Sequence, residues 1–180
     1  MFTSPTMYHP HRDTCMDKAV YRRILPLLDV SDEHDYTVLH LECGDGDDLK
    51  YMSTAIGKNS SFFGVDRSGE AIEHVDPEVA HDAKFHFLQY DIAKGIPFDY
   101  DFFDIVYGNN FLASIEDKDA LVREIYRVSK DKARIILFEQ DRDALAAILE
   151  SQFFVGFVYA CATHEPTKGY DGYVYVGNKL

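Results

Sequence analysis

The sequence of 180 residues is poor in basic residues, and this scarcity excludes one large class of partners. It has 18 Lys and Arg against 31 Asp and Glu, which gives a net charge of −13 at pH 7. Affinity for nucleic acid comes mainly from clustered basic side chains, and those of this chain are scattered. We therefore expect no nucleic-acid partner, and a small molecule or a protein instead.

Cysteines and long apolar runs are also scarce. The three cysteines are odd in number and widely spaced, which suggests neither a disulfide framework nor a paired zinc motif. The longest apolar runs, such as 135–138 and 153–160, are far too short to cross a bilayer, and residues 1–10 lack the apolar core of a signal peptide. These absences predict a cytoplasmic protein with no membrane partner.

The composition of the chain is typical of one folded domain. Apolar residues make up 46% of it, and 13 Phe and 12 Tyr recur throughout, which is typical of a globular protein. We expect residues 16–180 to form this domain. Residues 1–15 form an arm that is either mobile or a lid over the site. The arm holds His9, His11 and Cys15, but without a second ligand pair we expect no metal site.

Hydrophobic periodicity predicts an alternation of strands and helices. The expected helices cover residues 16–28, 48–56, 70–75, 118–128 and 142–151. The expected strands cover residues 37–41, 62–65, 85–88, 103–107, 133–138, 153–160 and 173–177. Strands separated by helices indicate a mostly parallel sheet covered on both faces. The last two strands have no helix between them, so we expect them to pair antiparallel.

Acidic residues follow the first three expected strands. The stretch "VLHLECGDGDD" runs from the first strand through a glycine turn into a helix, Asp66 follows the second strand, and Asp91 follows the third. Sheets of this type bind ligands at the carboxyl ends of their strands. The four carboxylates of 42–48 would repel a pyrophosphate at this helix start, whereas a cationic sulfonium bearing an ammonium group would be attracted.

Four stretches together resemble one family. "VLHLECGDGDD", "FFGVDRSGEAI", "FHFLQYDI" and "IPFDYDFFDIVYGNN" are similar, in this order, to the motifs of class I S-adenosylmethionine-dependent methyltransferases. The resemblance runs from about residue 16 to the end and is closest to the small-molecule branch. It implies an α/β fold, a Rossmann-like three-layer sandwich. Its sheet has seven strands in the order 3-2-1-4-5-7-6, with strand 7 antiparallel.

The resemblance also implies S-adenosylmethionine as cofactor, S-adenosylhomocysteine as product and a small-molecule acceptor. Asp66 takes the place of the ribose-binding acid and Asp91 lies beside the adenine, although each carboxylate could instead cap a turn or helix. The residues expected to bind the cofactor are Glu42, Gly44, Gly46, Asp66, Arg67, Asp91, Ile92 and Asn109. Methyl transfer depends chiefly on positioning, so no catalytic residue is assigned. The residues expected near the methyl group are Asn109, Asn110, Glu139 and Gln140.

Two residues depart from the family pattern. His40 stands where relatives have an acid, and Glu42 stands where they have their first glycine. A buried, unpaired carboxylate is costly, so in an empty site we expect Glu42 to be solvated or bound to His40, Lys or Arg. Two functions follow. Either the chain is a methyltransferase with a modified grip on the methionine end, or it is an inactive or regulatory protein whose cofactor site has decayed.

Overall fold

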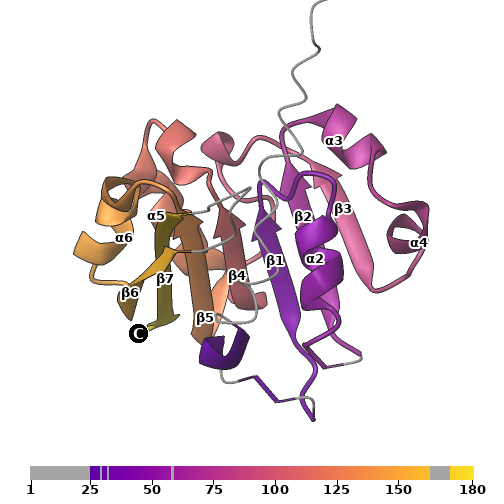
Figure 1. The fold of residues 1–180 in the computed structure, drawn as a ribbon, viewed down its shortest axis with the longest axis horizontal. Helices are drawn as coiled ribbons and strands as arrows, with labels where there is room; N and C mark the ends of the chain where they lie inside the picture. Colours follow the sequence, from indigo (N-terminus) through magenta and orange to yellow (C-terminus); the bar gives the residue numbers. More distant parts are fainter. Residues whose placement is uncertain (1–24, 29, 32, 58, 163–170) are drawn as a thin grey trace, which may run out of the picture.

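The sheet at the centre of the molecule contains seven strands in the order β3-β2-β1-β4-β5-β7-β6 (Figure 1). It is seen in a computed structural model, which describes residues 25–28, 30–31, 33–57, 59–162 and 171–180. The strands are β1 (Thr37–Leu41), β2 (Ser61–Asp66), β3 (Phe85–Gln89), β4 (Phe103–Asn109), β5 (Ser129–Glu139), β6 (Phe154–Ala162) and β7 (Asp171–Lys179).

Strand direction agrees with the prediction as well. The pairs from β3 to β5 are all parallel. Strand β7 is antiparallel to both β5 and β6. The predicted α/β class, strand order and antiparallel seventh strand are therefore confirmed.

The helices are shorter than the periodicity predicts, with one exception. The α-helices are α2 (Asp47–Met52), α3 (Gly69–Glu73), α4 (Pro77–Ala80), α5 (Lys118–Val128) and α6 (Ala146–Glu150). The 3-10 helices are η1 (Leu25–Leu28), η2 (Ile92–Lys94), η3 (Leu112–Ser114) and η4 (Arg142–Leu145). Only α5 has the predicted bounds. The single helix predicted over 142–151 is wrong, because the segment is divided between η4 and α6.

The early end of α2 has a local cause. The helix was predicted to reach residue 56, but the hydroxyl of Ser53 donates to the carbonyl of Lys50 and that of Thr54 to the carbonyl of Tyr51, each at 2.8 Å. Hydroxyl side chains that bond to nearby backbone in this way compete with continued helix. The short elements α4, η2 and η3 were not predicted, since three or four residues carry too little periodicity.

Two apolar layers cover the two faces of the sheet. One layer joins α5 and α6 to alternate residues of the strands, with Leu39, Val106 and Ile125 all fully buried. The other joins α2 and α4 to the opposite face, with Val38 and Leu49 at its centre. Figure 1 shows α2 against the sheet beside β1 and β2. None of the helices in the described ranges combines the length and apolar character needed to cross a membrane.

The N-terminal predictions can be followed only in part. The arm 1–15, with its two histidines and Cys15, lies outside the described residues, as does the predicted helix up to residue 24. Of that helix, only Leu25–Leu28 is described, and it forms the 3-10 helix η1.

Arg127 of α5 holds the segment that follows β3. Its Nη1 donates to the carbonyl of Phe98 and its Nη2 to the carbonyl of Ile96, both at 2.7 Å. The same guanidinium makes a bidentate pair with Glu124, whose Oε2 accepts from the amide of Ile96 at 2.8 Å. One planar group thus fixes the backbone that leads away from Asp91.

Arg127→Lys should therefore destabilise the fold. A lysine cannot reproduce this fork of donors, so we expect the free energy of unfolding to fall by about 1–3 kcal/mol. Chemical denaturation measures this change. The matched control is Arg123→Lys, an exposed position on the same helix, which should alter stability by less than about 0.5 kcal/mol. Equal effects in the two variants would contradict a bracing role for Arg127.

Candidate functional site

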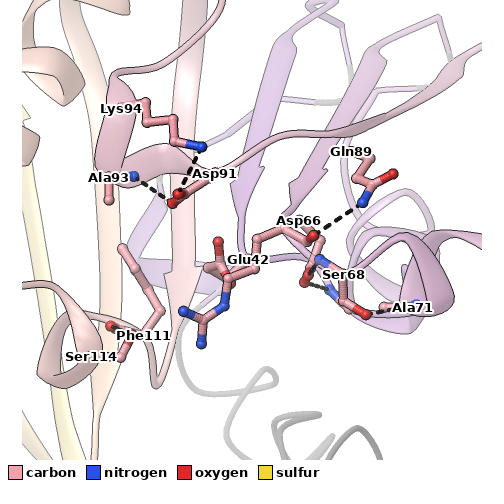
Figure 2. Close-up of polar contacts among 12 residues, drawn as sticks. Glu42, Asp66, Ser68, Ala71, Gln89, Asp91, Ala93, Lys94, Phe111 and Ser114 are labelled. Carbon is pink, nitrogen blue, oxygen red and sulfur yellow. Dashed lines mark hydrogen bonds and ion pairs between the residues drawn. The ribbon is translucent and has the colours of Figure 1, made fainter.

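Three carboxylates meet at the carboxyl ends of neighbouring strands. Glu42 follows β1, Asp66 is the last residue of β2, and Asp91 lies two residues beyond β3. Figure 2 shows the three side chains along one edge of the sheet, with Phe111 and Ser114 on the far side of Glu42. The parallel order β3-β2-β1 brings them together although they are far apart in sequence.

The two glycines of the turn after β1 have different roles. Gly44 (φ 57°) and Gly46 (φ 78°) both adopt left-handed backbone, which glycine accepts at no steric cost. A Cβ at Gly46 would meet the ring of Phe87 at 2.8 Å, so this glycine is needed for packing. A Cβ at Gly44 would meet nothing within 4 Å. Gly44 therefore leaves a backbone face that a ligand can approach.

The carboxylate of Asp66 connects two turns. One oxygen accepts a hydrogen bond from the amide of Gly44 and the other from the amide of Ser68, each at 2.8 Å. The side chain of Ser68 in turn accepts from the amide of Ala71 and caps α3. Asp66 is thus a structural residue whatever else it binds. Each of its oxygens still has a lone pair available for a ligand hydroxyl.

Asp91 caps the short helix η2. Its Oδ1 accepts from the amide of Ala93 at 3.1 Å, and its Oδ2 lies 3.5 Å from Nζ of Lys94. Its side chain is half-buried, so a ligand can reach it. The next residue, Ile92, packs in the apolar layer beneath α5 and presents no side chain to a ligand. Only the backbone of Ile92 is available to a ligand at this position.

Glu42 has the least favourable backbone in the site. Its φ of 53° lies in the left-handed region, where a residue with a Cβ is strained by about 1–2 kcal/mol. Its carboxylate Oε2 lies 3.7 Å from Nε of Arg67, and the side chains of Glu42 and Arg67 are 17% and 63% exposed, respectively. Among the partners that the sequence left open for Glu42, the structure thus provides an arginine.

The interactions with Arg67 are too weak to offset the surroundings of Glu42. Burial, together with the negative charges of Asp66 and Asp91, raises the pKa of Glu42 to about 7, and Arg67 opposes the shift only in part. The carboxyl group is therefore about half protonated at neutral pH. The negative charge of the Glu42 carboxylate is therefore destabilising at this position.

His40 is buried beneath the turn. Its ring lies 4.4 Å from the ring of Tyr107, centroid to centroid, and burial lowers the pKa of His40 to about 3. The imidazole is thus neutral in ordinary buffers. Within the described residues, neither ring nitrogen has a hydrogen-bond partner. Buried polar groups without a partner are rare, and these two nitrogens remain available to a ligand.

A buried network, which the sequence did not predict, lies beside His40. Oδ2 of Asp48 accepts from the hydroxyl of Tyr107 at 3.2 Å and from Nδ2 of Asn109 at 3.3 Å. Asp48 shares the inward face of α2 with Leu49 and Met52. The sequence signal that could have predicted the burial of Asp48 is its spacing of four residues from Met52. It places an acid on the apolar face of a helix.

The space between these groups is small. A pocket of about 10 Å³, room for roughly one water molecule, lies at the turn. The described residues that line it include four carboxylates and no Lys or Arg, and they are His40, Glu42, Cys43, Gly44, Asp45, Asp47, Asp48 and Asn109. The pocket thus attracts positive charge but has little free volume.

The residues expected near the methyl group do not all face this pocket. Asn109 does, at the end of β4. Oδ1 of Asn110 instead accepts from the amide of Gln140 at 3.0 Å. Glu139 is buried and accepts from the amides of Phe111 and Leu112. These contacts join the ends of β4 and β5 and start η3, so they explain Asn110 and Glu139 without a ligand.

Comparison with known proteins places this arrangement in a family. A family model described as a methyltransferase domain matches residues 32–176. A demethylmenaquinone methyltransferase of Lactococcus lactis subsp. lactis (strain IL1403) is 30% identical over 111 residues, which cover 61% of this chain and 44% of that relative. The matched region thus spans less than half the length of this curated relative.

Solved structures show the same fold at low identity. A SAM dependent methyltransferase from Aquifex aeolicus superposes with a TM-score of 0.70 at 16% identity, covering 88% of this chain and 89% of its own. The cyclase SpnF superposes with a TM-score of 0.69 at 14% identity, covering 92% and 83%. One fold therefore carries more than one named chemistry.

The raised pKa of Glu42 predicts a pH-dependent stability. An acid whose pKa is higher in the folded protein than in the unfolded chain stabilises the fold below the unfolded value of 4.5, and this stabilisation is lost as pH rises through about 7. After allowance for solvent screening, the loss should amount to about 2 kcal/mol.

Urea denaturation between pH 4 and pH 8 measures this effect. Glu42→Gln cannot ionise, so the difference in unfolding free energy between variant and wild type should widen in favour of the variant across this range. Glu33→Gln, at an exposed position outside the site, is the control and should show no such trend. A constant difference for Glu42→Gln would mean that Glu42 titrates normally.

Proposed function

This chain belongs to the methyltransferase domain family, and from that premise we propose that it transfers a methyl group from S-adenosylmethionine to a small-molecule acceptor. The observation that carries the proposal is the open backbone face of Gly44 beside Asp66, in a row that Asp91 continues at the carboxyl ends of the strands. A cofactor with a ribose and a base fits such a row of acceptors.

The adenosine end of the cofactor suits the residues present. Asp66 is fixed by two backbone amides and keeps a lone pair on each oxygen, so it would accept from the ribose hydroxyls. Asp91 is half-buried and would accept from the adenine amino group if Lys94 moved aside. Gly44 would allow close approach of the ligand to the backbone.

The methionine end fits less well. The acidic lining favours the sulfonium and ammonium groups, and the unprotonated ring nitrogen of neutral His40 would give the ammonium group an acceptor. The cofactor's own carboxylate would however meet Glu42, and the pocket of about 10 Å³ does not hold it. Binding thus requires the Glu42 side chain, which already lies beside Arg67, to turn further outward into solvent.

Methyl transfer requires few further groups from the protein. S-adenosylmethionine supplies an electrophilic methyl group, so the chain's residues have only to bind, orient and exclude water. Asn109 lines the pocket and is the residue proposed to face the acceptor. The net charge of −13 favours a small molecule over nucleic acid. Demethylmenaquinone, the acceptor named for the curated relative, is one candidate of this class.

A second candidate is an inactive or regulatory protein with a decayed cofactor site. The strained, partly buried carboxylate of Glu42 over a pocket the size of one water favours it. The fold alone does not distinguish a methyltransferase from an inactive or regulatory protein, since the cyclase SpnF has the same architecture.

Ligand binding separates the two candidates. Thermal denaturation with S-adenosylmethionine or S-adenosylhomocysteine should show stabilisation of about 2.7 kcal/mol at a hundred times the dissociation constant. The matched variant is Gly44→Ala, which strains the left-handed backbone at this position (φ 57°) and places a methyl group in the open space where the ligand would lie. It should weaken binding at least tenfold while the protein stays folded. No shift with either compound at millimolar concentration would favour the second candidate.

Glu42→Gly should strengthen binding of S-adenosylhomocysteine roughly tenfold, or about 1.4 kcal/mol. The change removes the left-handed strain, the buried charge and the side chain that fills the methionine end. Titration calorimetry of wild type, Glu42→Gly and Glu42→Gln measures the affinities, and the glutamine variant separates charge from bulk. Weaker binding by Glu42→Gly would mean that Glu42 pairs with the ammonium group. Equal affinities would mean that it plays no part.

A further inference from the structure

The outermost strand β6 has an open edge. Among the described residues it pairs with β7 alone, over nine residues from Phe154 to Ala162. The backbone N–H and C=O groups that point away from β7 face no other strand of the described ranges. Such an edge is a template for another extended chain unless the protein protects it.

An apolar stripe runs along this strand. Val155, Phe157 and Tyr159 are 56%, 70% and 42% exposed. They alternate with Phe154 and Val158, which pack in the layer beneath α5 and α6. The stripe therefore lies on the opposite face of the sheet from α6.

Charge and proline, two of the usual protections of an edge strand, are missing from β6. Residues 151–163 contain no charged residue and no proline, in a chain whose charged fraction is 27%. The opposite edge differs. Strand β3 has only five residues, the ion pair of Lys84 with Asp82 lies at its start, and α3 and α4 pack against it. Short length and flanking charge are devices that discourage edge pairing.

We propose that two copies of this chain pair through β6, antiparallel about a twofold axis, so that their sheets become continuous. A register centred on Phe157 places the two Phe157 rings opposite each other. Val155 then faces the partner's Tyr159 on the same side of the sheet. These are aromatic and β-branched pairs of the kind that stabilise adjacent strands.

Charge favours a second copy over a charged partner strand. A charged segment would bring its charges against the exposed apolar stripe and desolvate them. Two copies with a charge of −13 each repel one another over most of their surface, and β6 is where they can meet without facing charges. Because the remaining repulsion is long-range and screened beyond about 8 Å at physiological salt, association should strengthen as salt is added.

Pairing through β6 leaves the candidate site accessible. Strands β7, β5 and β4 lie between β6 and β1, whose carboxyl end leads to Glu42 and Gly44. The inference therefore stands independently of methyl transfer.

Sedimentation equilibrium of the full chain tests the proposal. We expect wild type to reach a mass twice that of the 20.6 kDa chain at micromolar concentration, with tighter association at 0.5 M than at 0.05 M NaCl. Phe157→Lys should raise the dissociation constant at least tenfold. Leu88→Lys, at an exposed apolar position (40%) on the opposite edge strand, should leave it unchanged. Circular dichroism checks that both variants are folded.

Crosslinking tests the register. In a background carrying Cys15→Ser and Cys161→Ser, a short bismaleimide should link two chains of Phe157→Cys efficiently and two chains of Val155→Cys poorly, because only position 157 meets its own copy. A monomer at all concentrations would overturn the proposal, as would association of Phe157→Lys equal to that of wild type. Equal crosslinking of the two cysteine variants would overturn the register and, with it, the pairing as described.

Discussion

The carboxylate of Asp66 holds together the part of the molecule on which the site depends. It joins the amide of Gly44, after β1, to the amide of Ser68, after β2, with one oxygen for each. Since Ser68 also caps α3, a single side chain fixes the glycine turn, the end of β2 and the start of a helix. Any ligand hydroxyl that binds Asp66 therefore meets an acceptor that is already oriented. The same engagement makes Asp66 hard to replace without loosening the turn.

A second constraint, at Glu42, works against binding. The turn requires left-handed backbone at three of five positions, and two of these are occupied by glycine. Glutamate at the third bears both a steric strain and a carboxylate placed near Asp66 and Asp91. Such strain persists where the surrounding structure enforces it and is often associated with function. Here the enforcing contacts are visible, because Asp66 holds Gly44 and Phe87 occupies the space behind Gly46.

Two parts of the sheet have different characters. At β1 and β2 the strands end in charged, hydrogen-bonded turns with little free volume. At β6 the sheet ends in an uncharged strand whose apolar side chains face outward. Ligand binding and the proposed self-association thus use separate parts of one sheet. The charged turns can bind polar groups, whereas the uncharged edge strand can approach the same strand of a second copy.

The sequence by itself determined the alternation of elements, the bounds of β1 and α5, and the order in which Glu42, Asp66 and Asp91 follow their strands. These features are local, because periodicity and strand ends are written in neighbouring residues. The resemblance to a family supplied the strand order. Only the tertiary structure decided what the side chains do. It turned Glu139 and Asn110 into links between β4 and β5, buried Asp48 with Tyr107, and left the ring nitrogens of His40 without a hydrogen-bond partner in the described part of the chain. Each of these outcomes depends on residues 28 to 59 positions apart or on burial, and no local pattern encodes which distant group a polar side chain will meet.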